Sequence, residues 1–258
     1  MKTVGIDIGS LVTKIALLDD SNMIDYRIDR STFDFKRIGH NLFDDILEKN
    51  NLKRADVYVM STGYGRNSID IADDRITEIT AHAKGAQYFY PEAHSVIDIG
   101  GQDSKAIVIS KKSGNVVDFQ MNDKCAAGTG RFLEVMAHAL EVKLEDMGRL
   151  SLQSSKKIEI SSMCTVFAET EVVGLVAREE RVEDIIAAIH YSLARRTANM
   201  VMRIGIKEKV MMTGGVAKNI GILHYLKDFI GVPLIVSENP QIVGAVGAAL
   251  ISLERIRG

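Results

Sequence analysis

The sequence predicts an α/β protein made of two lobes of similar topology. First, segments with strand character alternate with segments whose apolar residues have helical spacing. Second, Ile6-Asp7-Ile8-Gly9 recurs as Ile97-Asp98-Ile99-Gly100, and a hydroxyl residue and a lysine follow each copy at a constant offset of 91 (Thr13-Lys14 and Ser104-Lys105). That period does not fit the short repeats of solenoids. Third, 258 residues permit one large domain or two small lobes, with enough length for a substantial core.

Composition narrows the class of protein. Hydrophobic residues make up 46% and charged residues 26%, as in globular proteins. A net charge of -2 argues against a nucleic-acid partner. The apolar run from Val243 to Leu253 is too short to cross a membrane, and no basic start with an apolar stretch follows Met1. Two cysteines are too few for a disulfide framework, so we expect a reducing cytoplasm.

The first lobe is predicted to comprise residues 1–94. Its expected elements are a hairpin, a helix, a short strand, an S-T-G-Y-G-R turn and a second helix, over Thr3–Asp19, Phe33–Asn50, Val57–Met60, Ser61–Arg66 and Ile69–Tyr88. Glu78 and His82 lie four residues apart on the second helix. That spacing could suit a metal, but no third ligand is evident, so we expect a structural or cleft-lining role.

The second lobe is predicted to comprise residues 95–241, and the closing helix, 242–258, is expected to return to the first lobe. The expected elements are a second hairpin, then strands and helices in alternation, over Ser95–Ser110, Val116–Gln120, Arg131–Glu141, Ser161–Arg178, Val182–Ile204, Lys209–Thr213, Asn219–Phe229 and Pro233–Val236. The glycines and alanines of the closing helix, Gln241–Arg257, would allow close helix contact, at a hinge or simply in tight packing.

The two hairpins have the residues of a phosphate-binding site. A glycine after the aspartate lets backbone N–H groups approach phosphate oxygens. The hydroxyl and the lysine add donors and charge, and the aspartate can hold a hydrated magnesium ion. The bland alternative is that each D-I-G simply makes a tight turn. Neither a G-x-x-x-x-G-K-[ST] nor a G-x-G-x-x-G sequence occurs, which disfavours a P-loop or Rossmann protein.

The order of motifs resembles the superfamily of actin, sugar kinases and heat-shock-chaperone ATPases. The segment Met211-Met212-Thr213-Gly214-Gly215 completes this order of motifs as a strand that leads into a Gly-Gly turn. Taken alone, the segment could equally be an ordinary strand–helix turn. The resemblance implies a ribonuclease H-like fold in each lobe, ATP or ADP in the cleft between them, and lobe closure driven by nucleotide. It implies magnesium and the attacking water at Asp7 and Asp98.

The same resemblance implies the remaining nucleotide contacts. Gly214 and Gly215 would face the adenosine. Gln102 and Asp103 could each orient the water, and the sequence does not decide between them. The other cofactor-binding residues would be Gly9, Ser10, Thr13, Lys14, Gly100, Gly101, Ser104, Lys105, Gly128 and Gly130.

Cys125 and Cys164 are the only cysteines, and each immediately precedes a helical pattern. The N-terminal N–H groups of helices favour thiolates and anionic clusters. The alternative is two buried small hydrophobic residues. There is no C-x-x-C, and 38 residues separate the cysteines, so one chain lacks ligands for an iron–sulfur or zinc site. Two-fold symmetry would supply four thiolates.

Four segments resemble the activator component of 2-hydroxyacyl-CoA dehydratases, whose family includes the ATPase subunits of benzoyl-CoA reductases. They are D-K-C-A-A-G-T-G-R, S-S-M-C-T-V-F-A-E-T-E-V, S-T-G-Y-G-R and T-E-I-T-A-H-A-K-G-A. The resemblance implies a homodimer in which Cys125 and Cys164 of both chains hold one [4Fe–4S] cluster. Ferredoxin or flavodoxin would supply an electron, and ATP would drive it to a partner dehydratase or reductase. Lys124 and Arg131 flank the Cys125 turn and would tune the cluster, dock the partner or simply be solvated.

Two other functions fit the superfamily. One is a small-molecule kinase, and the other is a non-enzymatic switch of the actin or chaperone type. Neither needs both cysteines, so iron content discriminates the activator from both.

Overall fold

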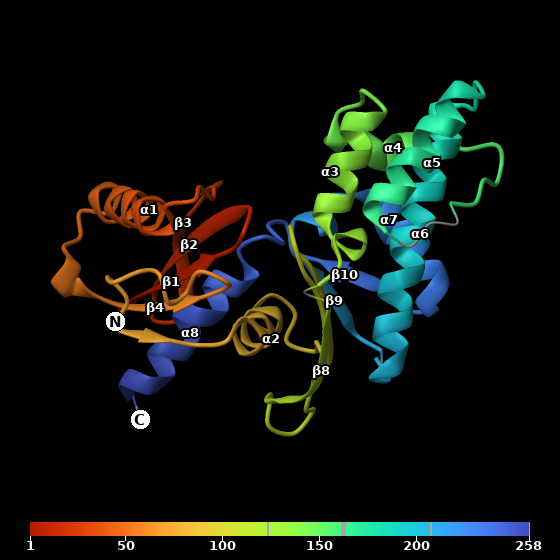
Figure 1. The fold of residues 1–258 in the computed structure, drawn as a ribbon. Coiled ribbons are helices and arrows are strands. Elements are labelled where there is room, and N and C mark those ends of the chain that lie inside the picture. The colour runs from red at the N-terminus through yellow and green to blue at the C-terminus, as the bar shows by residue number, and fades with distance from the viewer. Residues whose placement is uncertain (123, 161–163, 207, 258) are drawn as a thin grey trace. The chain divides into compact units, whose positions relative to one another are not determined.

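The computed structural model describes residues 1–122, 124–160, 164–206 and 208–257. The chain divides into two compact units (Figure 1). Unit 1 contains residues 1–96, 107–119 and 236–258, and unit 2 contains residues 97–106 and 120–235. The positions 123, 161–163, 207 and 258, which include parts of the predicted segments before both cysteines, lie outside the described residues.

Two five-stranded sheets have the same strand order. The first, β3-β2-β1-β4-β5, is built from β1 (Lys2–Ile8), β2 (Val12–Asp19), β3 (Asn22–Arg30), β4 (Val57–Thr62) and β5 (Asp74–Arg75). The second, β8-β7-β6-β9-β10, is built from β6 (Ser95–Ile99), β7 (Ser104–Ile109), β8 (Val116–Asn122), β9 (Val210–Thr213) and β10 (Leu234–Val236). Position by position the orders correspond, which confirms the predicted α/β class with two ribonuclease H-like sheets.

Unit 1 covers both faces of its sheet with helices. In β2, Ile15 and Leu17 belong to the core under α1 (Phe35–Lys49), whereas Ala16 and Leu18 belong to the core under α8 (Val243–Arg257). This alternation follows from the pleat of a strand. Figure 1 shows α1 and α8 on opposite faces of the sheet, and α2 (Glu78–Phe89) packs along α8.

Glycines let α2 and α8 approach closely. A Cβ on Gly85 would lie 1.9 Å from the carbonyl oxygen of Val243, and a Cβ on Gly247 would lie 1.8 Å from that of Ala81. Neither distance is sterically possible, so both positions require glycine. The small residues of the closing helix therefore serve tight packing against α2.

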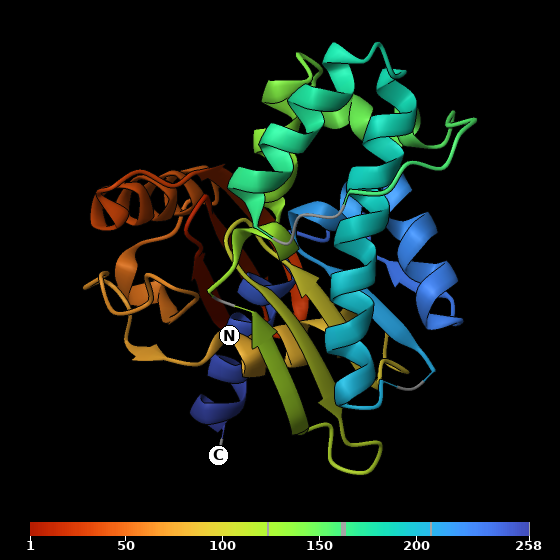
Figure 2. The same cartoon turned by 45° about the vertical axis from the view of Figure 1, so that its right-hand side comes forward.

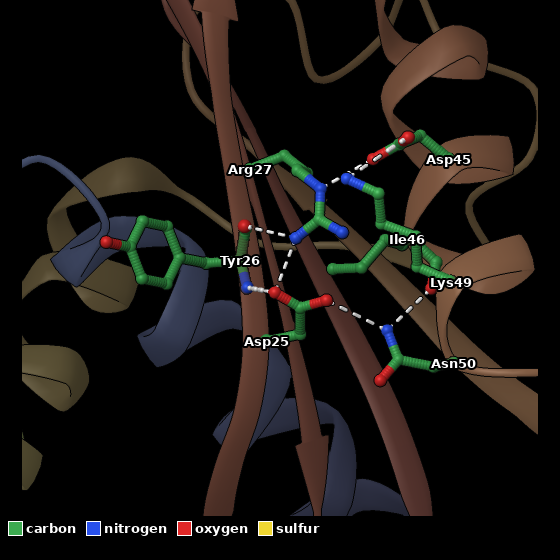
Figure 3. Close-up of polar contacts among 7 residues, drawn as sticks. All are labelled: Asp25, Tyr26, Arg27, Asp45, Ile46, Lys49 and Asn50. Atoms are coloured by element: carbon green, nitrogen blue, oxygen red, sulfur yellow. Dashed lines mark hydrogen bonds and ion pairs between the residues drawn. The ribbon is translucent and has the colours of Figure 1, made fainter.

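The strand β3 was not predicted, and a polar network ties it to α1 (Figure 3). Its apolar residues Ile24, Tyr26 and Ile28 alternate with polar ones, and Tyr26 and Ile28 pack against the core under α8. From the polar positions, Arg27 donates from Nε to Asp45 Oδ2 of α1 at 2.5 Å and from Nη1 to Asp25. Asn50, just after α1, donates to Asp25 Oδ2 at 3.0 Å. These contacts bind the strand to the helix across the edge of the sheet.

The helices of unit 2 pack mainly on one another. α6 packs against α7 and the short α4, and α3 packs against α5 (Figure 2). The bounds are α3 (Gly130–Ala139), α4 (Met147–Ser151), α5 (Thr165–Ala177), α6 (Val182–Arg203) and α7 (Ile220–Ile230). Short 3-10 helices are Arg54–Asp56, Ala126–Gly128, Leu144–Asp146 and Gly215–Lys218. In the described part of the chain, no helix is both long and apolar enough for a membrane span.

Candidate functional site

In unit 1 the first hairpin pairs Asp7 with Lys14. The two residues face each other across β1 and β2, and Lys14 Nζ lies 2.9 Å from Asp7 Oδ2. The aspartate is 3% exposed. The spacing between aspartate and lysine therefore places the two residues opposite each other as a cross-strand ion pair. The lysine neutralises the buried carboxylate close to the turn.

Two glycines from distant motifs enclose the Asp7 carboxylate. Gly63, in the S-T-G-Y-G-R turn, has a φ of +87°, and a Cβ there would lie 2.4 Å from Asp7 Oδ1. A Cβ on Gly244 would lie 3.1 Å from Asp7 Oδ2 and 2.9 Å from His82 Nε2. Since both atoms lie about 3 Å from one point, His82 and the carboxylate are within about 6 Å of each other. Sequence reasoning did not find the roles of Gly63 and Gly244.

His82 is buried in α2, whose first residue is Glu78. Within the described ranges, no three His, Cys, Asp or Glu side chains gather closely enough to hold a metal ion. The helix places the His82 imidazole beside Asp7.

The hydroxyl of Thr13 belongs to the wall of the same turn. Its Oγ1 lies 2.9 Å from Ser31 Oγ, and Ser31 donates to the carbonyl oxygen of Gly9 at 2.6 Å. The amide of Gly9 donates to the carbonyl of Val12 at 3.2 Å, which closes the turn around the half-buried Ser10.

In unit 2 the second hairpin repeats the ion pair with more partners. Lys105 is 2% exposed, and its Nζ lies 3.2 Å from Asp98 Oδ2 and 2.8 Å from Asp103 Oδ1. Thr213, the last residue of β9, donates to Asp98 Oδ1 at 2.8 Å. Both carboxylate oxygens of Asp98 thus have partners within the protein. Thr213 was missed, although its place directly before Gly214-Gly215 is a signal that could have found it.

The first glycine after β9, Gly214, is required by this packing. Gly214 has a φ of +86°, and a Cβ there would lie 2.3 Å from the carbonyl oxygen of Ile99 and 2.8 Å from Asp98 Oδ1. Gly215 follows as the first residue of a 3-10 helix. The backbone at Gly214 therefore lies against the end of β6, next to Asp98.

The second hairpin turn is hydrogen-bonded to the start of α3, the helix that follows the Cys125 turn. The amide of Gly130 donates to the carbonyl of Gly100, and that of Arg131 to the carbonyl of Gly101, both at 2.9 Å. Five residues earlier, Asn122 and Cys125 exchange two hydrogen bonds, of 2.9 and 3.2 Å. A shift of this turn would therefore move the start of α3 and, through it, the Cys125 turn.

The packing around Gly128 also limits the Cys125 turn. A Cβ on Gly128 would lie 2.7 Å from Asn122 Nδ2, the group that donates to the carbonyl of Cys125.

Gln102 and Asp103, the two residues considered for orienting water, differ in their surroundings. Asp103 is bound to Lys105, whereas the side chain of Gln102 is exposed.

Both cysteines are free, exposed thiols. The alternative of two buried hydrophobic residues is therefore wrong. Cys164 is the residue immediately before α5, and its carbonyl accepts from the amide of Ala168 at 2.9 Å. Cys125 precedes the 3-10 helix Ala126–Gly128, and α3 begins only at Gly130. The predicted position before a helix is thus confirmed at both sites, with a shorter helix at Cys125.

One arginine interacts electrostatically with both cysteines. Arg196 of α6 is half-buried; burial and the charge of Arg195 lower its pKa, whereas Cys125 and Cys164 raise it. α6 packs against the 3-10 helix that follows Cys125 and against α5, which follows Cys164. The elements that follow the two cysteines therefore meet on the helix that carries Arg196. A cation in that helix suits an anionic four-thiolate cluster, of which one chain would supply half the ligands. The sequence carried no signal for Arg196, which lies in a long helix.

Comparison with known proteins agrees with this geometry. The model of the BadF/BadG/BcrA/BcrD ATPase family matches residues 4–252. The chain is 44% identical over 255 residues to the (R)-2-hydroxyglutaryl-CoA dehydratase activating ATPase of Acidaminococcus fermentans, covering 98% of this chain and 97% of the relative. The crystal structure of component A of that organism's (R)-2-hydroxyglutaryl-CoA dehydratase has a TM-score of 0.95 at 42% identity, with 100% of both chains covered.

A second solved structure is that of the activator of the 2-hydroxyisocaproyl-CoA dehydratase from Clostridium difficile with bound ADPNP. It has a TM-score of 0.93 at 40% identity, covering 100% of this chain and 96% of the other. The resemblance inferred from the cysteine and glycine motifs is thereby confirmed. The chain belongs to the BadF/BadG/BcrA/BcrD ATPase family.

Proposed function

We propose that this ATPase is a reductive activator, which uses ATP to pass one electron to a partner 2-hydroxyacyl-CoA dehydratase or related reductase. The observation that carries the proposal is that the elements after Cys125 and Cys164 both pack on α6, which carries Arg196, in a chain whose second hairpin turn is hydrogen-bonded to the start of α3. That arrangement links a nucleotide-binding turn to a thiol pair.

The nucleotide part of the proposal rests on the two Asp–Lys hairpins. Asp7 and Asp98 would hold hydrated magnesium, through water or after their lysines shift toward phosphate. The turn glycines would offer amides to the phosphates, and Gly214 and Gly215 would meet the adenosine. Of the two residues considered for orienting water, we propose Gln102, because it is exposed while Asp103 is bound to Lys105. The C. difficile activator named above binds ADPNP, which supports a nucleotide site.

The thiol part of the proposal is a homodimer that shares one [4Fe–4S] cluster. Each chain would contribute Cys125 and Cys164, and the bound cluster would take up and release one electron. α5 supports the pairing, because it is apolar on its exposed side as well as its buried side. Val166, Phe167 and Val173 are 65%, 68% and 54% exposed, and all three lie on α5, the helix that begins directly after Cys164. A second copy would cover this face while completing the ligand set.

Electrostatics would let Arg196 stabilise the cluster. Four thiolates make a strongly anionic site, and a half-buried guanidinium beside two of them offsets part of that charge. The N-terminal end of α5 acts in the same direction.

Exposed free thiols favour a reducing compartment, so we propose the cytoplasm, with ferredoxin or flavodoxin as the electron source.

Iron analysis of anaerobic variants tests the proposal. We expect brown wild-type protein with about four irons per dimer, and colourless protein from Cys125→Ala or Cys164→Ala. Ser113→Ala, in an exposed turn remote from both cysteines in sequence, should leave the iron content unchanged. A variant lacking either cysteine that keeps its iron would refute the ligand assignment. ATP turnover that rises with a sugar or a small acid, and that needs no iron, would favour the kinase instead.

A further inference from the structure

A cavity in unit 2 takes no part in the proposed nucleotide and thiol sites. Its volume is about 570 Å³, within the usual range for small-molecule sites. The walls are the loop after α4, one side of α6 and the exposed side of α7, formed by Ser151, Leu152, Ser154–Ile158, Ala187, Ala188, Tyr191, His224, Tyr225, Asp228 and Phe229. Neither cysteine and none of the hairpin residues line it.

The loop wall of this cavity is fixed by Asp184, a 2% exposed residue in the first turn of α6. Its Oδ1 accepts hydrogen bonds from Ser154 Oγ, the Ser155 amide and the Lys156 amide at 2.9, 2.7 and 3.0 Å. Burial alone would raise the pKa of Asp184, but these hydrogen bonds lower it below its ordinary value. The carboxylate is therefore ionised at neutral pH, and the cavity is preformed.

Aromatic rings make the opposite wall. The rings of Tyr191 and Phe229 lie 4.9 Å apart, and Tyr225 meets Tyr191 edge-on at 6.3 Å. The Tyr225 hydroxyl donates to the carbonyl of Ser151 at 3.3 Å, which ties this wall to the loop. Ala187 and Ala188 leave room beside the rings. A flat apolar group would match this wall in shape and in polarity.

Charged side chains of both signs line the cavity. Lys157 Nζ lies 5.4 Å from the centre of the Tyr191 ring, and Arg195, which is not a lining residue, lies 6.0 Å from the same ring. Lys156 is bound to Glu180 at 2.6 Å, and the lining carboxylate Asp228 lies 3.6 Å from His224 Nε2. Lys157 has only a loose contact, 3.8 Å, with Glu159, so an anion placed at the Tyr191 ring would meet the Lys157 ammonium.

We propose that this cavity binds a small anion with a flat apolar body, of the aromatic carboxylate class, against Tyr191 and Lys157. The rings would stack on the body, and the Lys157 ammonium would pair with the carboxylate. None of the residues proposed for the nucleotide or for the thiol pair lines this cavity.

Calorimetry with 1-naphthoate on the anaerobically purified protein tests this proposal. We expect saturable binding of one 1-naphthoate per chain, unaffected by ATP, and at least tenfold weaker binding of the neutral 1-naphthalenemethanol. Lys157→Gln should weaken 1-naphthoate about three- to tenfold. Lys227→Gln, an exposed lysine on α7 outside the cavity, should leave the affinity unchanged.

Five results would overturn the proposal. Four are an absence of saturable binding, displacement of 1-naphthoate by ATP, equal binding of the neutral probe, and an affinity that Lys157→Gln leaves unchanged. A second variant, Tyr191→Phe, keeps the ring and removes only its hydroxyl, so it should bind 1-naphthoate within about twofold of wild type. The fifth contradicting result is a large loss of affinity in Tyr191→Phe, which would exclude binding by the ring face.

Discussion

Acidification should destabilise the protein through His190, a buried histidine of α6. Burial lowers its pKa to about 3, so the folded protein keeps it neutral, whereas the unfolded chain binds a proton near pH 6.5. Because the unfolded state binds more protons, stability is full above pH 6.5 and falls as the pH drops toward 3. At pH 5 this one group costs about 2 kcal/mol of unfolding free energy relative to pH 7.

The local geometry supplies the physical reason. His190 Nε2 lies 3.1 Å from Asn219 Nδ2, and Asn219 Oδ1 caps α7 by accepting from the amides of Gly221 and Ile222. With Nε2 accepting from the amide, the ring must be neutral. A proton added to Nε2 would remove this hydrogen bond and place an uncompensated charge in the core.

Urea unfolding under anaerobic conditions at pH 7 and pH 5 measures the effect. His190→Leu should be less stable at pH 7 but should lose about 2 kcal/mol less than wild type on going to pH 5. His138→Gln, an exposed histidine of α3, should follow wild type. If wild type and His190→Leu lost equal stability between the two pH values, the assigned neutral state of His190 would be refuted.

Three further substitutions test the packing, the second hairpin and the thiol site. Gly85→Ala should cost about 1–3 kcal/mol in unfolding free energy, because its Cβ would meet the Val243 carbonyl, whereas Gly174→Ala, with open space around it, should not destabilise. Thr213→Val should lower the ATPase rate by weakening the position of Asp98, and Thr213→Ser, which keeps the hydroxyl, should restore it; equal rates in both variants would contradict the role of that hydrogen bond. Arg196→Gln should lower the cluster's midpoint potential in an electrochemical titration, by on the order of 50 mV for an interaction of about 1 kcal/mol, and an unchanged potential would remove Arg196 from the site.

The fold was largely predictable because the strongest signals were periodic. Long helices such as α1 and α6 have regular apolar spacing, and the D-I-G repeat marked both hairpins. β3 was missed although Ile24, Tyr26 and Ile28 alternate with polar residues, a pattern typical of a strand, whereas the polar network centred on Arg27 has no signal in the sequence. α4 has only five residues, which is too short for helical periodicity to show.

The candidate site was predictable as a set of motifs but not as a set of contacts. The repeat indicated that Asp and Lys act together, yet only the register of β1 and β2 shows that they form a cross-strand pair. The glycines at 63 and 244 meet Asp7 from segments far apart in the chain, and no local pattern records that meeting. The elements that follow the two cysteines meet on a third, α6, which carries Arg196, and no local pattern records that meeting either.

The most direct test of the shared cluster is native mass spectrometry of the protein kept free of oxygen. The account predicts a species of twice the 28.4 kDa chain mass plus one set of four irons and four sulfides, which dissociates into chains when the iron is chelated. A single chain without iron as the sole species, under the same conditions, would contradict the account.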